Sequence, residues 1–282
     1  MKSSLLIILF VLAATAECFS QNITRIRTFD SEYDAAFNYL LEANRPYPDL
    51  SSDMYGKGQS AIDVYGSFNQ DYTEVSISGT YGLSERVNVT GTVALLTTNY
   101  NVLDRRVSGV GDFLLSSRLL LGSGDYFSHY IQAGIKIPAA KTADKLGTGK
   151  FDYHFGFVEN YANKSISCDF LASFDMLGRP DWPENQIAVY QNAIDSVKAN
   201  YDFTYQPNYT IGVYPSYYVN NNFSLTTGID FSRDMRLNYN SSTYYLGFNY
   251  GLSNVSTLGV GSNFNILNSA NYYFTAVLTV DL

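Results

Sequence analysis

From about Gly58 to its last residue the chain alternates polar and apolar positions with a period of two. Residues 74–81 read Glu-Val-Ser-Ile-Ser-Gly-Thr-Tyr, and residues 165–170 read Ser-Ile-Ser-Cys-Asp-Phe. Successive side chains of a strand point to opposite faces, so each such run has one polar and one apolar face. The pattern predicts about twelve strands. They fall near residues 58–68, 72–82, 87–98, 109–121, 126–138, 149–162, 165–176, 198–219, 222–232, 243–251, 256–264 and 272–282.

The connections between these runs form two classes. Those after even-numbered strands are tight, at 83–86, 122–125, 163–164, 220–222 and 252–255. Those after odd-numbered strands are longer, at 99–108, 139–148, 177–197, 233–242 and 265–271, with only 69–71 short. Outer-membrane barrels have short periplasmic turns and longer outer loops. An even strand count then places both ends of the barrel in the periplasm. Fourteen strands are the alternative count if the long eighth run is broken at Pro207 or Pro215 and forms two strands.

Ionisable residues fall on the polar face of the runs. A charge on the lipid face costs about 2–4 kcal/mol for Arg or Lys at the bilayer midplane. A β-sandwich would also alternate, but its inner face would be the apolar one. We therefore predict an all-β fold, a closed antiparallel transmembrane β-barrel of about twelve strands with a polar lumen. The expected lumen-lining residues are Glu74, Asp112, Arg118, Lys136, Asp152, His154, Asp169, Asp175, Asp202 and Asp230.

The first residues have the order of a secretory signal peptide. One lysine precedes an apolar run at residues 5–16, which is shorter than the roughly 20 residues of a membrane-spanning helix. We expect cleavage before Gln21, with cleavage before Glu17 or lipidation at Cys18 as alternatives. The predicted organisation is a signal peptide at 1–20, an N-terminal segment at 21–56 and the barrel at 57–282. The polar segment 21–56 fits a periplasmic lead, a plug inside the lumen or a disordered stretch equally well.

Composition supports an exported membrane barrel. The chain has 25 Tyr and 18 Phe but only 16% charged residues, against about 25% in soluble domains. Its net charge of −8 argues against nucleic-acid binding, which needs a basic face. Cleavage at Gln21 leaves Cys168 alone, which excludes an intrachain disulfide. Residues 184–197 have apolar positions at helical spacing, which predicts a short amphipathic helix over the outer mouth or else a disordered loop. Tyrosines at strand ends are expected to form interfacial girdles: Tyr81, Tyr100, Tyr126, Tyr161, Tyr218, Tyr244 and Tyr272.

Three short segments carry a family resemblance. They are Gly109-Val110-Gly111-Asp112 with Ser117-Arg118-Leu119, then Gly134-Ile135-Lys136-Ile137-Pro138, then Leu146-Gly147-Thr148-Gly149-Lys150-Phe151-Asp152. In order and spacing they resemble the outer-membrane family named for the meta-cleavage pathway of phenol degradation. The chain departs from that family at Ala139-Ala140, where a small residue and glycine are usual. It also ends in Leu282, where an aromatic residue is commonest in outer-membrane barrels.

The resemblance implies a barrel that passes small compounds, hydrophobic or aromatic ones among them. We expect an outer-membrane channel or passive transporter of a Gram-negative bacterium, without catalytic residues, metal or cofactor. The expected partners are outer-membrane lipids and lipopolysaccharide, touched by Lys141, Lys145 and Lys150, together with the barrel-assembly machinery and a small-molecule solute. An outer-membrane enzyme acting on lipid or protein and a barrel acting through its surface loops are the alternatives.

Two lumen groups bear on these alternatives. Asp112, with Arg118, Lys136 and Asp152, would form either a charged constriction that selects solutes or a structural ion-pair network. His154 lies two residues from Asp152 on the same face. A carboxylate beside a histidine suits acid–base catalysis, but a wet lumen produces such neighbours anyway. His129 has no metal-ligand pattern around it.

Overall fold

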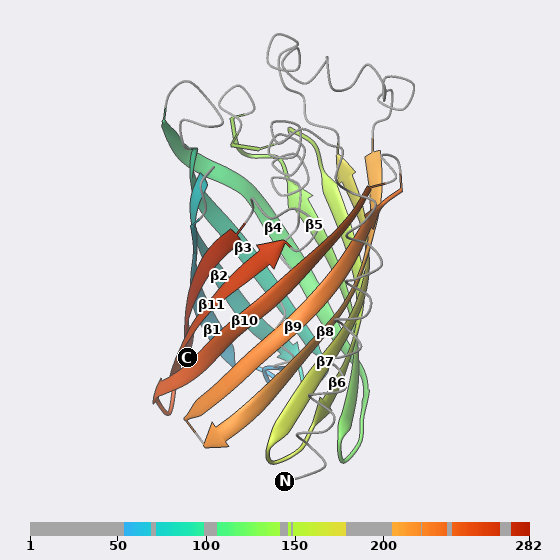
Figure 1. Ribbon diagram of the computed structural model, residues 1–282, viewed down its shortest axis with the longest axis vertical. Helices are drawn as coiled ribbons and strands as arrows, with labels where there is room; N and C mark the ends of the chain where they lie inside the picture. Colours follow the sequence, from blue (N-terminus) through green and yellow to red (C-terminus); the bar gives the residue numbers. More distant parts are fainter. Residues whose placement is uncertain are drawn as a thin grey trace, which may run out of the picture.

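The computed structural model of the chain describes residues 54–68, 72–98, 106–141, 146–147, 149–178, 205–220, 222–235, 239–265 and 272–282. Twelve antiparallel strands form a closed barrel (Figure 1). The strands are β1 (Ser60–Phe68), β2 (Tyr72–Ser84), β3 (Val87–Thr98), β4 (Val107–Ser123), β5 (Phe127–Ile137), β6 (Asp152–Ala162), β7 (Ile166–Gly178), β8 (Tyr205–Asn220), β9 (Phe223–Asp234), β10 (Tyr239–Ser253), β11 (Ser256–Asn265) and β12 (Tyr272–Asp281). The predicted fold class is confirmed.

Each strand pairs with its neighbours in the chain, and the pairing of β1 with β12 closes the barrel. The closing register runs from Ala61 opposite Asp281 to Phe68 opposite Phe274. Beyond it, the Leu282 amide donates to the Ser60 carbonyl oxygen at 2.8 Å. Closure matters in a membrane because unpaired backbone groups in hydrocarbon cost several kcal/mol each.

The tight connections that follow the even-numbered strands lie at one end of the barrel, the lower end in Figure 1, which we call the turn end. The opposite end, where the odd-numbered strands finish, is the loop end. The turn between β6 and β7 shows how such a connection is fixed, because the Asn163 side chain accepts from the amides of Ser165 and Ile166 at 2.9 and 3.0 Å. Asparagine side chains favour such turns by bonding to the backbone just ahead.

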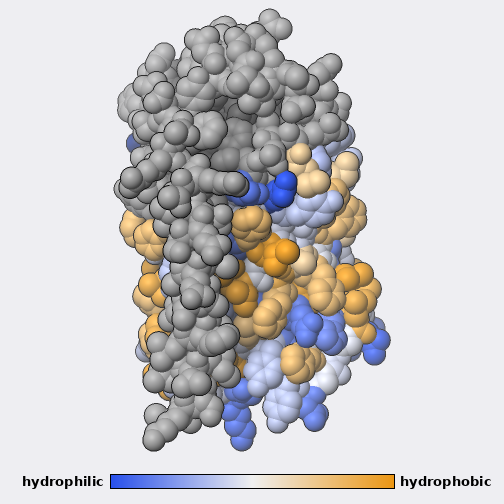
Figure 2. Space-filling view, turned by 45° about the vertical axis from the view of Figure 1, so that its right-hand side comes forward, coloured by the Kyte–Doolittle hydropathy of each residue, from blue (hydrophilic) through white to orange (hydrophobic). Residues whose placement is uncertain are grey.

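The two faces of the wall have opposite chemistry. Large apolar side chains point outward, and Figure 2 shows them as a belt around the part of the wall that is visible there. Ile77, Phe155 and Ile211 are 48%, 53% and 66% exposed. Buried positions carry polar and charged groups, among them Glu74, Arg118 and Asp152. A β-sandwich buries its apolar face instead, so that alternative is wrong.

The observed strands differ from the predicted runs mainly at their ends. β10 begins at Tyr239, four residues before the predicted start at 243, and β6 begins at Asp152 instead of 149. The alternative of a break in the eighth strand is wrong, since β8 continues through Pro207 and Pro215. Its pairing with β9 instead lapses between Val213 and Ser216, where Pro215 has no amide hydrogen to donate.

Several sequence predictions lie outside the described residues. They are the signal peptide, residues 21–53, the helix at 184–197, Tyr100, Lys145 and Asp202. No helix among the described residues is long and apolar enough to cross a membrane.

Candidate functional site

A β-bulge near the loop end of β4 turns Asp112 toward the lumen. Val110 and Phe113 lie opposite Leu95 and Val93 of β3, so Gly111 and Asp112 together oppose one residue of that strand. Val110 and Phe113 are both exposed on the outer face. Gly111 and Asp112 are therefore both directed inward, which is the local effect of one extra residue in a strand.

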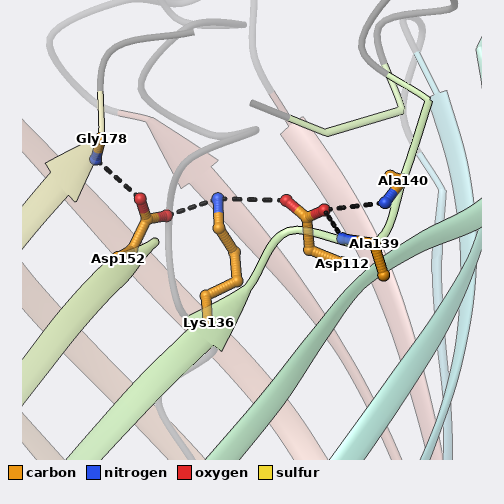
Figure 3. Close-up of polar contacts among 6 residues, drawn as sticks. All are labelled: Asp112, Lys136, Ala139, Ala140, Asp152 and Gly178. Atoms are coloured by element: carbon orange, nitrogen blue, oxygen red, sulfur yellow. Dashed lines mark hydrogen bonds and ion pairs between the residues drawn. The ribbon is translucent and has the colours of Figure 1, made fainter. Parts of the chain in front are cut away.

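The Asp112 carboxylate joins an ion-pair group that we call the mouth cluster, formed by Asp112, Lys136 and Asp152. The Lys136 ammonium lies 3.4 Å from Asp112 Oδ2 and contacts Asp152 Oδ2 (Figure 3). All three side chains are at least nine-tenths buried. Because the residues come from β4, β5 and β6, the cluster ties three neighbouring strands together near the loop end.

The same carboxylates also hold backbone segments. Asp112 Oδ1 accepts from the amides of Ala139 and Ala140 at 3.0 and 3.1 Å, and Asp152 Oδ1 accepts from the Gly178 amide at 2.7 Å (Figure 3). Hydrogen bonds to a charged acceptor are about twice as strong as neutral ones. The mouth cluster therefore fixes the chain where it leaves β5 and where it leaves β7.

Two glycines let the β5–β6 connection approach β4 closely. A Cβ on Gly147 would lie 2.6 Å from Asp112 Oδ1, and one on Gly109 would lie 2.5 Å from Leu146 Cδ1. Leu146 is only 3% exposed. Residues from each part of the family resemblance, namely Gly109, Asp112, Lys136, Leu146, Gly147 and Asp152, thus lie near one another on the inner wall.

A second polar group crosses four strands further toward the turn end. His154 Nδ1 lies 2.5 Å from Asp175 Oδ1, and His154 Nε2 lies 2.7 Å from Gln132 Nε2. Gln132 Oε1 accepts from Arg118 Nη2 at 3.5 Å, so the Gln132 amide nitrogen donates to Nε2 and Nδ1–H donates to Asp175.

The partner of His154 comes from the neighbouring strand. His154 bonds to Asp175, its register partner on β7, and not to Asp152 two residues away. Of the residues considered for a lumen charge network, Asp112, Lys136 and Asp152 form the mouth cluster, and Arg118 Nη2 donates to Gln132 Oε1. Partners directly opposite on neighbouring strands are closer than residues that share a face along one strand.

An aromatic layer, not predicted from the sequence, lies among these polar groups. Tyr130 and Tyr214 pack with Val158 and Leu171 in a buried cluster, and Leu120, Met54 and Tyr245 pack against it. We call Tyr130, Tyr214 and Tyr245 the tyrosine layer.

Glycines seat two of these rings. A Cβ on Gly228 would lie 2.2 Å from Tyr214 Cδ1, and one on Gly247 would lie 2.3 Å from the Tyr245 hydroxyl. Tyrosine two residues from glycine, as in Gly212-Val213-Tyr214 and Tyr245-Leu246-Gly247, is the sequence signal that was missed.

Residues 54–59 lie against the inner wall at the turn end, and we call them the inner segment. With its amide oriented to satisfy both groups, Asn88 accepts from the Tyr55 amide at 2.8 Å and donates to the Tyr55 carbonyl oxygen at 2.9 Å. Gly58 donates to the Gly82 carbonyl oxygen at 2.8 Å. The Met54 side chain meanwhile reaches the cluster of β5–β8. The inner segment therefore bridges from β2 and β3 toward the opposite wall.

The remaining candidate residues occupy separate places on the inner face. Glu74 is fully buried in β2. Asp169 accepts from Asn160 Nδ2 at 2.6 Å, and Asp230 accepts from the Tyr214 hydroxyl at 3.1 Å. His129 and Glu159 lie on the outer face, 3.8 Å apart. No group of three or more His, Cys, Asp or Glu side chains in the described part of the chain is placed to hold a metal ion.

The tyrosine girdle is seen in part at the turn end. Tyr126 and Tyr81 are 57% and 50% exposed, and the ring centroids of Tyr126 and Tyr161 lie 6.2 Å apart. Tyr218 was wrongly placed in this girdle. Its hydroxyl bonds to Ser167 at 3.1 Å, and it pairs with the buried Ser224, so it belongs to the inner face.

Comparison with solved structures finds the same barrel fold in several outer-membrane proteins. A COG4313 outer membrane channel from Pseudomonas putida F1 matches with a TM-score of 0.61 and 11% identity, covering 84% of this chain and all of that one. The KdgM porin matches with a TM-score of 0.55 and 6% identity over 79% of this chain and 99% of the porin. The NanC porin matches with a TM-score of 0.53 and 10% identity over 78% of this chain and 98% of the porin.

No family model and no curated protein matches the sequence. The resemblance to the family named for phenol degradation therefore stays a prediction. At these low identities the structural likeness shows the shared barrel fold.

Proposed function

We propose that this protein is an outer-membrane channel or passive transporter for small solutes. The observation that carries the proposal is the division of the wall into an apolar outer face and an inner face of charged, amide and hydroxyl groups. Lipid favours the first face, and water or a polar solute favours the second. The turn end would face the periplasm, as in other barrels with short turns at that end.

The tyrosine layer supports a finer proposal about the solute. Tyr130 and Tyr214 pack with Val158 and Leu171 inside the barrel, with Tyr245 against them, and form an apolar and aromatic level among the polar inward groups. Aromatic and aliphatic side chains with a few placed polar groups are the usual lining of small-molecule sites. Small compounds with a hydrophobic or aromatic body would match this level, in agreement with what the family resemblance implies.

Single-channel recording in planar lipid bilayers tests the proposal. The folded wild-type protein should give discrete conductance steps in KCl. Tyr245→Ala should conduct at least about twofold more, because an aromatic ring inside the barrel is removed. Tyr250→Ala on the outer face of the same strand is the matched control and should conduct like wild type. A folded protein that shows no steps, or a Tyr245→Ala variant that conducts like wild type, contradicts this function.

A further inference from the structure

We infer that the connection between β5 and β6 folds back inside the loop end of the barrel and sets the size limit for solutes that enter there, with Asp112 as the residue that holds it in place. The inference rests on the proposed channel function and adds a size-selecting element to it. It concerns the described parts of the connection, residues 138–141, 146–147 and 149–151.

The connection contacts a strand that a direct link between β5 and β6 would not reach. β4 and β6 lie on opposite sides of β5. Leu146 nevertheless lies against β4, where its Cδ1 is 2.5 Å from the position that a Cβ on Gly109 would take. Gly109 directly precedes the outward-facing Val110, so this Cβ position is on the inner face. The connection therefore turns back inside the barrel before it reaches β6.

Both ends of the connection are fixed at this place. Leu146 is only 3% exposed, and its amide donates to the Lys141 carbonyl oxygen at 3.3 Å. A Cβ on Gly147 would lie 2.6 Å from Asp112 Oδ1 and 2.7 Å from the Ala140 Cβ. The chain at 146–147 thus packs directly on the wall and on the beginning of the same connection.

Asp112 divides its two carboxylate oxygens between the wall and the connection. Oδ2 lies 3.4 Å from the Lys136 ammonium of β5, while Oδ1 accepts from the amides of Ala139 and Ala140 (Figure 3). Hydrogen bonds to an ionised acceptor are about twice as strong as neutral ones. Asp112 is therefore a positioning residue for the connection. Its removal leaves Lys136 paired with Asp152, so the wall keeps an ion pair when the connection is released.

A segment folded inside the mouth reduces the width that a solute can use. The barrel has twelve strands, a number that leaves little spare diameter once side chains fill the interior. Pore diameter is one of the properties by which channels select solutes. Release of the connection from Asp112 should therefore admit larger solutes at the loop end.

Thiol labelling tests where the connection lies. Leu146→Cys is made in a chain whose Cys18 and Cys168 are replaced by serine, and the folded protein is treated with a membrane-impermeant maleimide. We expect slow labelling, and labelling at least about tenfold faster after Asp112→Ala, because the thiol has to leave the wall to react. Asp112→Asn keeps an uncharged acceptor for the two amides and should give an intermediate rate. Asp169→Ala, near the turn end of β7, removes another inward carboxylate and should leave the rate unchanged.

One-sided polymer exclusion tests the size limit. Single channels are recorded in KCl while neutral polyethylene glycols of increasing size are added to one side at a time, and a polymer that enters the channel lowers its conductance. Asp112→Ala should admit a larger polymer than wild type from one side and the same polymer from the other. Asp169→Ala should match wild type from both sides. Should Asp112→Ala not fold, Gly109→Leu serves instead, because its side chain occupies the place of Leu146 and should raise the limit on the same side.

The two measurements separate this inference from the channel function. Fast labelling before Asp112 is changed, an unchanged rate after Asp112→Ala, or an unchanged polymer limit each overturns the inference and leaves the channel function standing on its conductance. A folded protein without conductance refutes the channel function and the size limit together, while the labelling rates still report where the connection lies.

Discussion

Replacing Gly82 with alanine should push the inner segment off the barrel wall. A Cβ at this position would lie 2.1 Å from the Gly56 carbonyl oxygen and 2.7 Å from that of Tyr55. Both are backbone atoms well inside van der Waals contact, so no side-chain rotation relieves the clash. The alanine itself suits a strand, and so the inner segment rather than β2 has to move.

The size of the effect follows from the bonds that the segment makes. Displacement breaks the bonds between Gly58 and the Gly82 carbonyl and between the Gly82 amide and the Gln59 carbonyl, at 2.8 and 2.9 Å, and the two bonds of Asn88 to Tyr55. A typical hydrogen bond contributes about 1 kcal/mol net, so full displacement should lower the free energy of unfolding by roughly 2–4 kcal/mol. Met54 would leave the tyrosine layer, which should raise the single-channel conductance.

Urea titration in detergent and bilayer recording measure the two effects. Gly79→Ala in the same strand is the matched control, because a Cβ there meets nothing within 4 Å; we expect a change below about 0.5 kcal/mol and unchanged conductance. Asn88→Ala removes the two hydrogen bonds to Tyr55 without adding a clash. It should lower the free energy of unfolding and raise the conductance, each by less than Gly82→Ala does. If Gly82→Ala matches Gly79→Ala in both measurements, the inner segment does not narrow the lumen and this reasoning is wrong.

Two further predictions concern the mouth cluster and the lipid face. Lys136→Met should lower the free energy of unfolding by about 3 kcal/mol or more, because it leaves two buried carboxylates without their shared cation. The control Lys164→Met, in an exposed turn, should change the free energy of unfolding little. Equal urea midpoints for the two variants would contradict the role assigned to the mouth cluster. Ile77→Arg, in the middle of the outer face of β2, should lower the free energy of unfolding by about 2–4 kcal/mol. Leu83→Arg, near the turn end, should lower it by only about 0–1 kcal/mol. Equal losses of stability would show that Ile77 does not face hydrocarbon.

Much of the barrel could be predicted because the information is local. Alternation along single strands put Asp112, Asp169 and Asp230 on the face opposite Ile77 and Phe155, and the structure has them there. Turn residues such as Asn163 marked the tight connections. Strand ends such as Tyr239 and Asp152 were predicted less accurately, because the length of a strand depends on how far the adjacent strand continues to pair with it.

The contacts inside the lumen could not be predicted in the same way. His154 meets Asp175, and Tyr214 lies against Gly228, because of the register between strands that are distant in sequence. One bulge residue at Gly111-Asp112 changes which face the following side chains take. The inner segment has no polar–apolar alternation, and its place is set by backbone contacts with Gly82 and by the bonds of Asn88 to Tyr55.

By itself, the sequence determined that the chain forms a closed sheet with an apolar outside and a charged inside, since that follows from the period of two and from the cost of charge in lipid. Only the tertiary structure decided which carboxylate meets Lys136, which partner holds His154 and which tyrosines gather in the lumen. The physical reason is that such contacts are set by register, bulges and barrel closure, which are properties of strand pairs rather than of any one strand.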